Sequence, residues 1–346
     1  MARPSASRPA PALTRAALVA VAVAALIAVP KTTASAALAT FFPTQSIGDR
    51  GTDVAALQQL FHGYQVGRGT VADRVSTGAR NPLVVPVDGI FGAATAQGMR
   101  GVQAGRHLPE TGIADAATWG ALIVQVGPGS TGDAVKALQR ELVQKRRAVV
   151  PLDGVYGAAT TTAVKAFQAH MGLPQTGIAD AATWRALVWH YEEPRFSASS
   201  LCDYDPPANA NWGTAEMIAT LDAAGRAMVA AGYGRVAVGD VSYEHGGDHP
   251  EHRSHEVGLD ADIRMMRKAN DQCSIGSNWR LASYDRTATR ALVKAIRAAT
   301  PGHVKWIFFN DPVLISEGLT THLDGHDDHL HIHLCEAEHP DPDYRC

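Results

Sequence analysis

Apolar and polar residues follow the same pattern in two stretches of the chain, and that pattern predicts short helices. In the first stretch Val54, Leu57 and Leu60 fall at the spacing of one helix face. The equivalent positions in the second stretch are Val135, Leu138 and Leu142. A further helix is expected over 158–172, and a third ends near residue 187. Each stretch therefore predicts a small three-helix bundle.

The two stretches are copies of one unit. The sequence TGIADAATW occurs at 111–119 and again, unchanged, at 176–184, which is an offset of 65 residues. Upstream, GDRGTDVAALQ (48–58) matches GSTGDAVKALQ (129–139) at an offset of 81 residues. The first copy therefore carries 16 extra residues, which we place within the Gly-rich and polar segment 62–82.

The pattern changes after residue 189, where strands begin to mix with helices. Residues 190–213 combine Pro, Ser and Asn without a period and predict a linker. In the remaining segment, 214–346, helices are expected at 214–231 and 283–299. Strands are expected at 234–243, 303–309 and 328–334. Since no βαβ rhythm is present, this segment predicts an α+β domain with a mainly antiparallel sheet.

The first 36 residues differ from the rest of the chain. Three arginines precede 14 uncharged apolar residues (16–29), and Ala34-Ser35-Ala36 supplies the small residues of a cleavage site. This predicts a secretory signal peptide at 1–36 rather than a membrane anchor, which needs about 20 apolar residues. Cleavage would leave 27 basic and 34 acidic residues, a formal charge of −7. We therefore expect a secreted protein that binds neither membranes nor nucleic acid.

The cysteines fit an exported protein. All four lie in the last 145 residues, at Cys202, Cys273, Cys335 and Cys346. An even set outside the cell favours two disulfides, for which three pairings are open. A zinc site made of cysteines is not expected, because the chain has no CxxC pair.

Histidines are concentrated in two windows, which hold nine of the 15 in the chain. They are His245, His249, His252 and His255 in the first window, and His322, His326, His329, His331 and His333 in the second. Within the strand expected at 328–334, His329, His331 and His333 alternate with apolar residues and share one face. Neighbouring imidazoles on such a face lie about 6 to 7 Å apart and can converge on one metal ion.

The first window supplies the partners for such an ion. Gly258 allows the backbone to turn between His255 and Asp262, and Asp260 shares a strand face with Asp262. A histidine, an aspartate and a second histidine from separate segments, with water as the fourth ligand, form the open arrangement of a catalytic zinc. Competing motifs, namely HExxH, GxSxG and the P-loop, are absent from the sequence.

The repeated unit resembles a known family. The order Gly-x-x-Gly, Leu-Gln, Asp-Gly-x-x-Gly-x-x-Thr, Phe-Gln and Asp-x-x-Thr-Trp-x-x-Leu is similar to that of the peptidoglycan-binding domain of bacterial wall hydrolases. The resemblance implies one such domain at 44–124, with an insertion at 62–82, and a second at 125–189. We expect the repeated glycines, with Trp119 and Trp184, to serve turns and the core rather than binding.

The C-terminal segment resembles a second family. The sequences GDVSYEHGG, HRSHEVGLDADI, YDRTATRALVKAI, KWIFFN and GHDDHLHIHLC occur in the order found in penicillin-insensitive murein endopeptidases, across most of 210–336. These belong to a wider group with lysostaphin, D-Ala-D-Ala carboxypeptidases and hedgehog. The group's signature is a histidine, six residues, an aspartate and a later His-x-His.

The second resemblance implies roles for individual residues. Zinc would be held by His255, Asp262 and His331, with His329 as the catalytic histidine. The accessory residues around the site are His252, His326, Asp260 and Asp328. The chemistry of such a site leaves Asp260 either to orient the metal ligands or to play a plain structural role. It also leaves Asp328 or His326 to assist His329 in handling protons. His333 is expected below the site, and His245, His249 and His322 in loops.

Together these features predict a zinc metallopeptidase that cuts peptidoglycan. The family's bond joins D-alanine to diaminopimelate in the stem-peptide bridge, and the repeated domains would tether the enzyme to the wall. Two alternatives remain open: a D,D- or L,D-carboxypeptidase that trims single stems, and a catalytically silent wall-binding protein. Zinc is expected from the ligand types, which also accept cobalt or manganese.

Overall fold

The computed structural model describes residues 41–67, 84–196, 200–205, 210–248, 254–337 and 339–346. All of them belong to one compact unit, Ala37–Cys346. The predicted signal peptide, most of the predicted insertion, and His249 and His252 lie outside the described residues.

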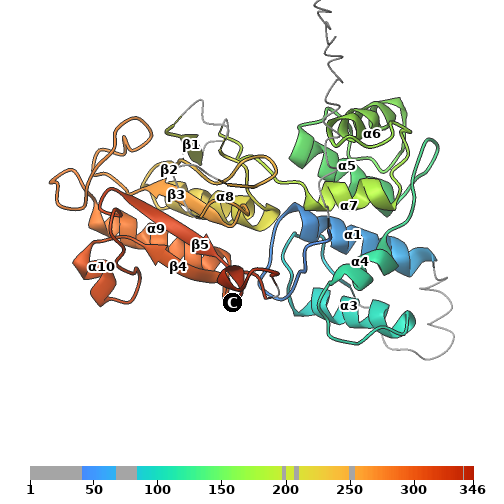
Figure 1. Ribbon diagram of the computed structural model, residues 1–346, viewed down its shortest axis with the longest axis horizontal. Coiled ribbons are helices and arrows are strands. Elements are labelled where there is room, and N and C mark those ends of the chain that lie inside the picture. Colours follow the sequence, from blue (N-terminus) through green and yellow to red (C-terminus); the bar gives the residue numbers. More distant parts are fainter. Residues whose placement is uncertain (1–40, 68–83, 197–199, 206–209, 249–253, 338) are drawn as a thin grey trace, which may run out of the picture. The chain divides into compact units, whose positions relative to one another are not determined.

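Among the described residues, six helices lie in the two repeated modules, which Figure 1 draws in blue to green. The first module contains α1 (Thr52–Gly67), α3 (Ala93–Gly105) and α4 (Ala116–Leu122). The second contains α5 (Asp133–Arg146), α6 (Ala158–His170) and α7 (Ala181–Trp189). In both copies of TGIADAATW the aspartate caps the third helix of its module. The Asp115 and Asp180 carboxylates accept from the backbone amides three residues further along the chain. The three-helix prediction is confirmed.

The repeated glutamines hold the turns of each module. In the second module, Gln139 is buried, its Oε1 accepts from the Gly154 amide at 2.9 Å, and its Nε2 donates to the Val155 carbonyl at 3.0 Å. Gly154 has φ +73°, a conformation that favours glycine. Gln58 makes the same contacts in the first module. Trp119 and Trp184 are fully buried. The expectation that these repeated residues serve the fold is confirmed.

The two modules share one hydrophobic core, which the repeat alone did not predict. Helices α1 and α5 pack against each other, and their buried apolar residues belong to one continuous cluster. A fully buried lysine also joins them. Lys145 Nζ of α5 lies 2.5 Å from Asp53 Oδ1 of α1, and it donates to the Leu187 and Val188 carbonyls at the end of α7.

The C-terminal segment builds a five-stranded sheet together with residues 201–203, which the sequence had placed in a linker; the strands are labelled in Figure 1. The strands are β1 (Leu201–Asp203), β2 (Val236–Val238), β3 (Asp260–Arg264), β4 (Val304–Phe308) and β5 (His329–Leu334). Their order is β1-β2-β3-β5-β4, and every neighbouring pair except the parallel β1–β2 is antiparallel. The predicted α+β domain with a mainly antiparallel sheet is confirmed.

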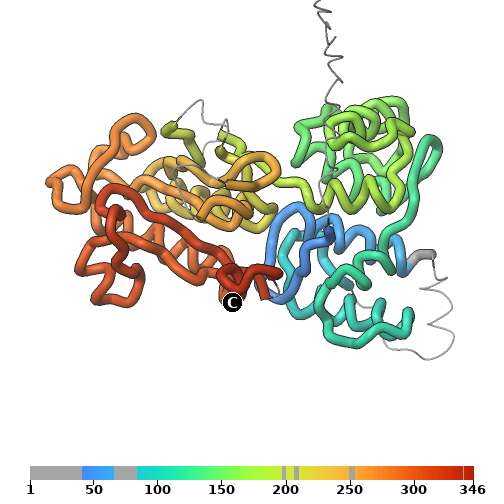
Figure 2. Tube along the Cα trace, in the orientation of Figure 1, coloured from blue at the N-terminus to red at the C-terminus, as the bar shows by residue number. Residues whose placement is uncertain are grey.

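Strand β2 is shorter than the segment 234–243 that the sequence predicted. Beyond Val238 the Gly239 position is crowded, because a Cβ there would meet the Tyr204 ring at 2.4 Å. The amides of Val241 and Ser242 then donate to the Ala210 carbonyl, at 2.6 and 2.9 Å, instead of continuing the ladder with β3. The tube trace in Figure 2 follows the chain through this region.

Two long helices cover the sheet: α8 (Ala215–Ala230), capped by the Thr214 hydroxyl, and α9 (Arg286–Ala299), capped by Asp285. They pack on each other and share a second core with the apolar residues of the strands. A short helix, α10 (Pro312–Ser316), and a 3₁₀ turn, η1 (Pro342–Tyr344), complete the domain. No helix among the described residues is long and apolar enough to cross a membrane.

Both disulfides lie in this domain. Cys202 pairs with Cys273, and Cys335 pairs with Cys346. The two bonds confirm the expectation of two disulfides and select one of the three pairings that the sequence left open.

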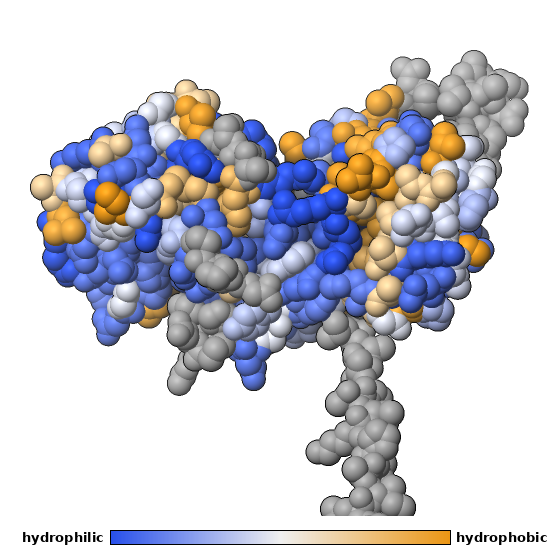
Figure 3. Space-filling model, turned by 90° about the horizontal axis from the view of Figure 1, so that it is seen from above, coloured by the Kyte–Doolittle hydropathy of each residue, from blue (hydrophilic) through white to orange (hydrophobic). Residues whose placement is uncertain are grey.

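Figure 3 shows that the surface over the helical modules gathers apolar side chains among polar ones. Large apolar side chains that stay exposed in the second module include Val149, which is 96% exposed, Leu152 and Val155. By contrast, Figure 3 shows a mainly hydrophilic surface over the sheet domain, with a few apolar side chains on it.

Candidate metal centre

One face of the sheet carries apolar residues that join the core, and the other face carries histidines and aspartates. Along β5, Leu330, Ile332 and Leu334 point into the core, and the alternating residues His329, His331 and His333 therefore occupy the opposite face. Strand β3 follows the same rule, with Ala261 and Ile263 in the core and the two aspartates on the other face. The shared strand faces predicted for both sets are confirmed.

The register of β3 and β5 brings these residues together. Asp262 is the direct partner of His331, and Asp260 is the direct partner of His333. Asp262 Oδ1 lies 2.9 Å from His331 Nδ1. A single strand pairing therefore creates a buried row of alternating carboxylates and imidazoles.

His255 reaches the same place from the loop before β3. Its φ is +69°, in the left-handed region that non-glycine residues rarely adopt, and its side chain is fully buried. Gly258 (φ +71°) makes the turn between His255 and β3, as predicted. The His255 Nδ1 donates to the Val241 carbonyl at 2.9 Å, so its Nε2 carries the lone pair and faces Asp262 Oδ1 at 3.6 Å.

His255, Asp262 and His331 thus offer two imidazole nitrogens and one carboxylate oxygen, all within 4.8 Å of one another. The rings of the two histidines meet edge to face, with centroids 4.9 Å apart. Burial alone would raise the pKa of Asp262, but the neighbouring imidazoles of His255 and His331 hold it well below its usual range. The carboxylate is therefore ionised, and the donor set suits a zinc ion.

Asp260 connects the cluster to its surroundings. Its Oδ1 lies 3.0 Å from His331 Nε2 and 2.7 Å from His333 Nδ1. Its Oδ2 accepts from the His255 amide and from the Tyr344 hydroxyl, at 3.2 and 2.8 Å. Asp260 is fully buried and touches both histidines of the predicted ligand set, which is the arrangement expected of a residue that orients ligands.

His329 stands at the solvent side of the cluster. Its Nδ1 lies 2.9 Å from Asp328 Oδ1, which orients the ring, and its Nε2 lies 3.8 Å from Asp262 Oδ1. The side chain is 24% exposed and therefore open to solvent. His326 lies beside it, with ring centroids 4.8 Å apart, and burial lowers the pKa of His326.

Among the described residues, the remaining histidines of the two sequence windows are not members of the His255, Asp262 and His331 cluster. His333 lies below the site and contacts Asp260 and the Asp343 carbonyl, as expected. His322 is exposed. His252 lies outside the described residues.

His245, expected to be a loop histidine, belongs to a second cluster with His170, His190 and Glu244. This cluster was not predicted from the sequence. A departure from the repeat could have indicated it. At the offset of 65 residues, the second module has His170 and His190 where the first has Gly105 and Gln125, so the two histidines are not part of the common unit.

The comparisons with known families agree with the predicted architecture. Residues 50–122 and 131–187 match the putative peptidoglycan binding domain, and residues 205–305 match the penicillin-insensitive murein endopeptidase family. The matches thus follow the predicted order, with two segments similar to the peptidoglycan-binding domain and then one similar to the murein endopeptidase family. The last of these contains His255 and Asp262, whereas β5 with His329 and His331 lies beyond its matched end.

Two individual proteins are also similar to parts of the chain. An uncharacterized protein in the bpoA1 3′ region of Kitasatospora aureofaciens is 45% identical over 58 residues, which is 16% of this chain and 49% of that protein. The chain therefore matches about half the length of this relative. A crystal structure of the Burkholderia AP3 phage endolysin is 27% identical, with 37% of this chain and 42% of that chain covered. Its TM-score of 0.18 is no evidence of a shared overall fold.

Proposed function

We propose that this protein is a secreted, zinc-dependent murein endopeptidase that hydrolyses D-alanyl-diaminopimelate cross-links in peptidoglycan. The observation that carries the proposal is the cluster of His255, Asp262 and His331 beside the partly exposed His329. The match of 205–305 to the murein endopeptidase family supports the reaction, and the two peptidoglycan-binding segments support the substrate.

In this proposal His255, Asp262 and His331 hold the zinc ion. When bound, zinc supplies the Lewis acidity that activates water for attack on a peptide carbonyl. Asp260 keeps the rings in place, since it hydrogen-bonds the His255 amide and the imidazole of His331. The fixed Nδ1–H of His255 has the same effect, because it leaves only Nε2 to bind the metal.

His329 handles the proton in the proposed mechanism. Asp328 accepts from Nδ1–H, so Nε2 is the atom that faces the cluster and exchanges a proton. Protonated, the ring stabilises the oxyanion and then passes its proton to the leaving amine. Zinc peptidases with an HExxH motif use the glutamate of that motif as the general base. This sequence has no such motif, so the proposal assigns proton transfer to His329.

The helical modules serve the reaction by keeping the enzyme on its substrate. A domain that binds the wall polymer raises the local concentration of cross-links around the linked peptidase domain, even when each binding contact is weak. Export is part of the same proposal, because the substrate lies outside the cytoplasm.

The test is product analysis on purified, cross-linked peptidoglycan by liquid chromatography and mass spectrometry. We expect muropeptide dimers to disappear and uncross-linked monomers to accumulate. The His331→Ala variant and a chelator should both stop this, whereas the exposed-histidine control His322→Ala should not. Stems that lose a terminal residue while dimers persist would indicate a carboxypeptidase. Unchanged muropeptides with wall binding retained would indicate a silent binding protein.

A further inference from the structure

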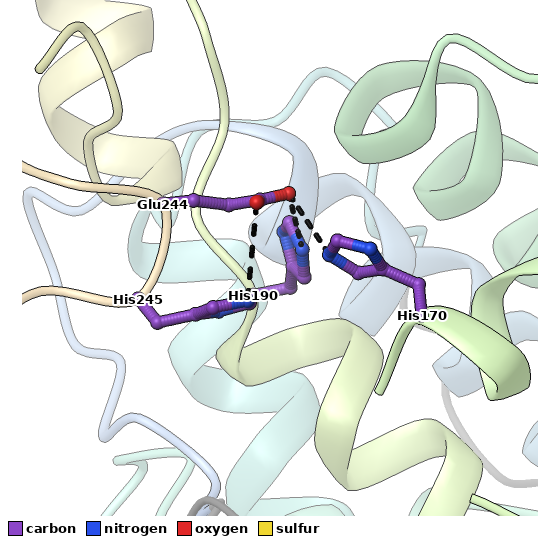
Figure 4. Close-up of side chains that lie close together, drawn as sticks. All are labelled: His170, His190, Glu244 and His245. Atoms are coloured by element: carbon purple, nitrogen blue, oxygen red, sulfur yellow. Dashed lines mark ion pairs between the residues drawn. The ribbon is translucent and has the colours of Figure 1, made fainter. Parts of the chain in front are cut away.

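The second histidine cluster lies at the contact between the second helical module and the sheet domain. His170 is the last residue of α6, and His190 directly follows α7. Glu244 and His245 come from the segment after β2. Figure 4 shows the three imidazole rings gathered around the Glu244 carboxylate. The ligand atoms of these four residues all lie within 4.8 Å of one another.

The distances within the cluster resemble those of the sheet site. Glu244 Oε1 lies 2.9 Å from His170 Nε2 and 3.5 Å from His190 Nε2, and its Oε2 lies 4.0 Å from His245 Nε2. The three ring centroids lie 5.1 to 5.6 Å from one another. The ligand atoms of a tetrahedral zinc lie about 3.3 Å apart, so small side-chain movements would complete the coordination shell.

His190 is prepared as a ligand in the same way as His255. Its Nδ1 donates to the Tyr191 carbonyl at 2.7 Å, which leaves the lone pair on Nε2, the atom that faces Glu244. The side chain is fully buried. A neutral Nε2 and a carboxylate oxygen are both acceptors, and a cation between them removes their repulsion.

The guanidinium of Arg146 occupies part of the space between Glu244 and His190 that a metal ion would take. Arg146 Nη1 hydrogen-bonds Glu244 Oε1 and lies 3.4 Å from His190 Nε2. The side chain of Arg146 is 26% exposed, so it can move toward solvent when another cation enters. Within the described part of the chain, Arg146 hydrogen-bonds Glu244 and contacts His190 but makes no hydrogen bond or ion pair with His170 or His245.

We propose that His170, His190, Glu244 and His245 form a second site for a divalent transition metal, with zinc as the expected ion. Three imidazoles and one carboxylate are the ligand types that zinc prefers. Since all four positions are filled by protein, the geometry is that of a structural rather than a catalytic site. The proposal does not depend on the sheet site being catalytic.

An ion at this site would join the two parts of the protein. Two ligands belong to the second helical module and two to the segment that supports the sheet site. Within that segment the Val241 carbonyl accepts from His255 Nδ1, and the Gly247 amide donates to the carbonyl of Glu256. The second ion would therefore fix both the position of the module and the loop that carries His255.

The experiment is metal analysis of the full chain, expressed without a histidine tag and dialysed against micromolar free zinc. We expect two zinc ions per chain in the wild type and one in His331→Ala, which removes the sheet site. In the His331→Ala background, a further His170→Ala or Glu244→Gln change should remove the remaining ion. His322→Ala in the same background should keep it, and so should Arg146→Gln, which removes the competing guanidinium.

Zinc should also raise the Tm of the His331→Ala protein by a few degrees, and it should not raise the Tm of His331→Ala/His170→Ala. His170 is the exposed last residue of its helix, so its loss is compatible with folding, which circular dichroism would verify. The proposal is wrong if His331→Ala holds no zinc. It is equally wrong if the remaining ion survives both His170→Ala and Glu244→Gln, because the cluster would then be an ion-pair network only.

Discussion

Asp262 Oδ1 lies 2.9 Å from His331 Nδ1, and the two residues are direct register partners across β3 and β5. The site therefore depends on strand pairing as much as on residue type. A shift of one residue in this register would turn the whole row of histidines into the core. The apolar residues that alternate with them, Leu330 and Ile332, fix the register because both are fully buried.

Replacing His329 should separate metal binding from catalysis. His329→Gln leaves His255, Asp262 and His331 untouched, so the zinc content should not change. Loss of the proton-transfer group should lower the rate of cross-link cleavage by about 10² to 10⁴-fold. The rate is measured as loss of muropeptide dimers, with His322→Gln as the control. A variant that lost zinc together with activity would instead make His329 a ligand.

The buried lysine should carry much of the joint stability of the helical modules. Lys145→Met would leave Asp53 and Glu141 buried without their cation, which costs about 3 to 5 kcal/mol. The matched control is Lys136→Met in the same helix, where the lysine is 42% exposed and pairs with Asp133 at 3.9 Å. Its cost should stay below about 1 kcal/mol. Urea unfolding of both variants measures the difference, and equal costs would contradict the assigned role.

Most residues of the candidate sheet site could be grouped from the sequence, because one simple periodicity, the alternation of residues along a strand, places them. Strict alternation from His329 to Leu334 defines the two faces of β5, and Asp260 and Asp262 share a face of β3 for the same reason. A glycine at 258 indicated the turn that brings His255 back to the sheet. These relationships are local, so they could be deduced before any tertiary contact was known.

Features that depend on tertiary contacts were not predictable in the same way. Lys145 lies in a polar-looking stretch of α5 and would be assigned to the surface, yet it is fully buried against α1 and α7. The pairing of Cys202 with Cys273 depends on where two distant segments meet. His190 and Glu244 are 54 positions apart, and only the packing of α7 on the sheet domain brings them together.

Stability should fall as the pH rises from about 7 to about 10, through a buried histidine between two carboxylates. His303 Nδ1 lies 2.6 Å from Asp49 Oδ1 and 3.0 Å from Glu216 Oε1. Burial alone would lower the pKa of His303, but the two carboxylates raise it to about 10. An unfolded histidine titrates near its ordinary pKa of about 6.5, so this contribution is complete below that pH and is lost as the pH passes 10.

The control for this pH effect is His303→Gln, which cannot take up the proton. Urea unfolding across the range should show a steeper loss of stability in the wild type than in His303→Gln. Parallel pH profiles for the two proteins would show that the histidine is neutral in the folded state, against this account.

The two disulfides should contribute unequally to stability. In the chain-entropy model the bond between Cys202 and Cys273, 71 residues apart, contributes about 4 kcal/mol, and the bond between Cys335 and Cys346, 11 residues apart, about 3 kcal/mol. We expect the Cys202→Ser/Cys273→Ser protein to have the lower Tm of the two double variants. The reverse order, measured by calorimetry, would contradict the loop-length argument.

The most direct test of the central claim is zinc titration into chelator-treated protein, followed by the rate at which muropeptide dimers disappear. The His170→Ala variant is the protein of choice, because it retains the sheet site and lacks a ligand of the proposed second site. Our account predicts no cleavage after chelation, and recovery of the rate that this same variant had before chelation at one equivalent of zinc. Cleavage that continues without metal, or that fails to return when zinc is bound, would contradict the assignment of His255, Asp262 and His331 as a catalytic zinc site.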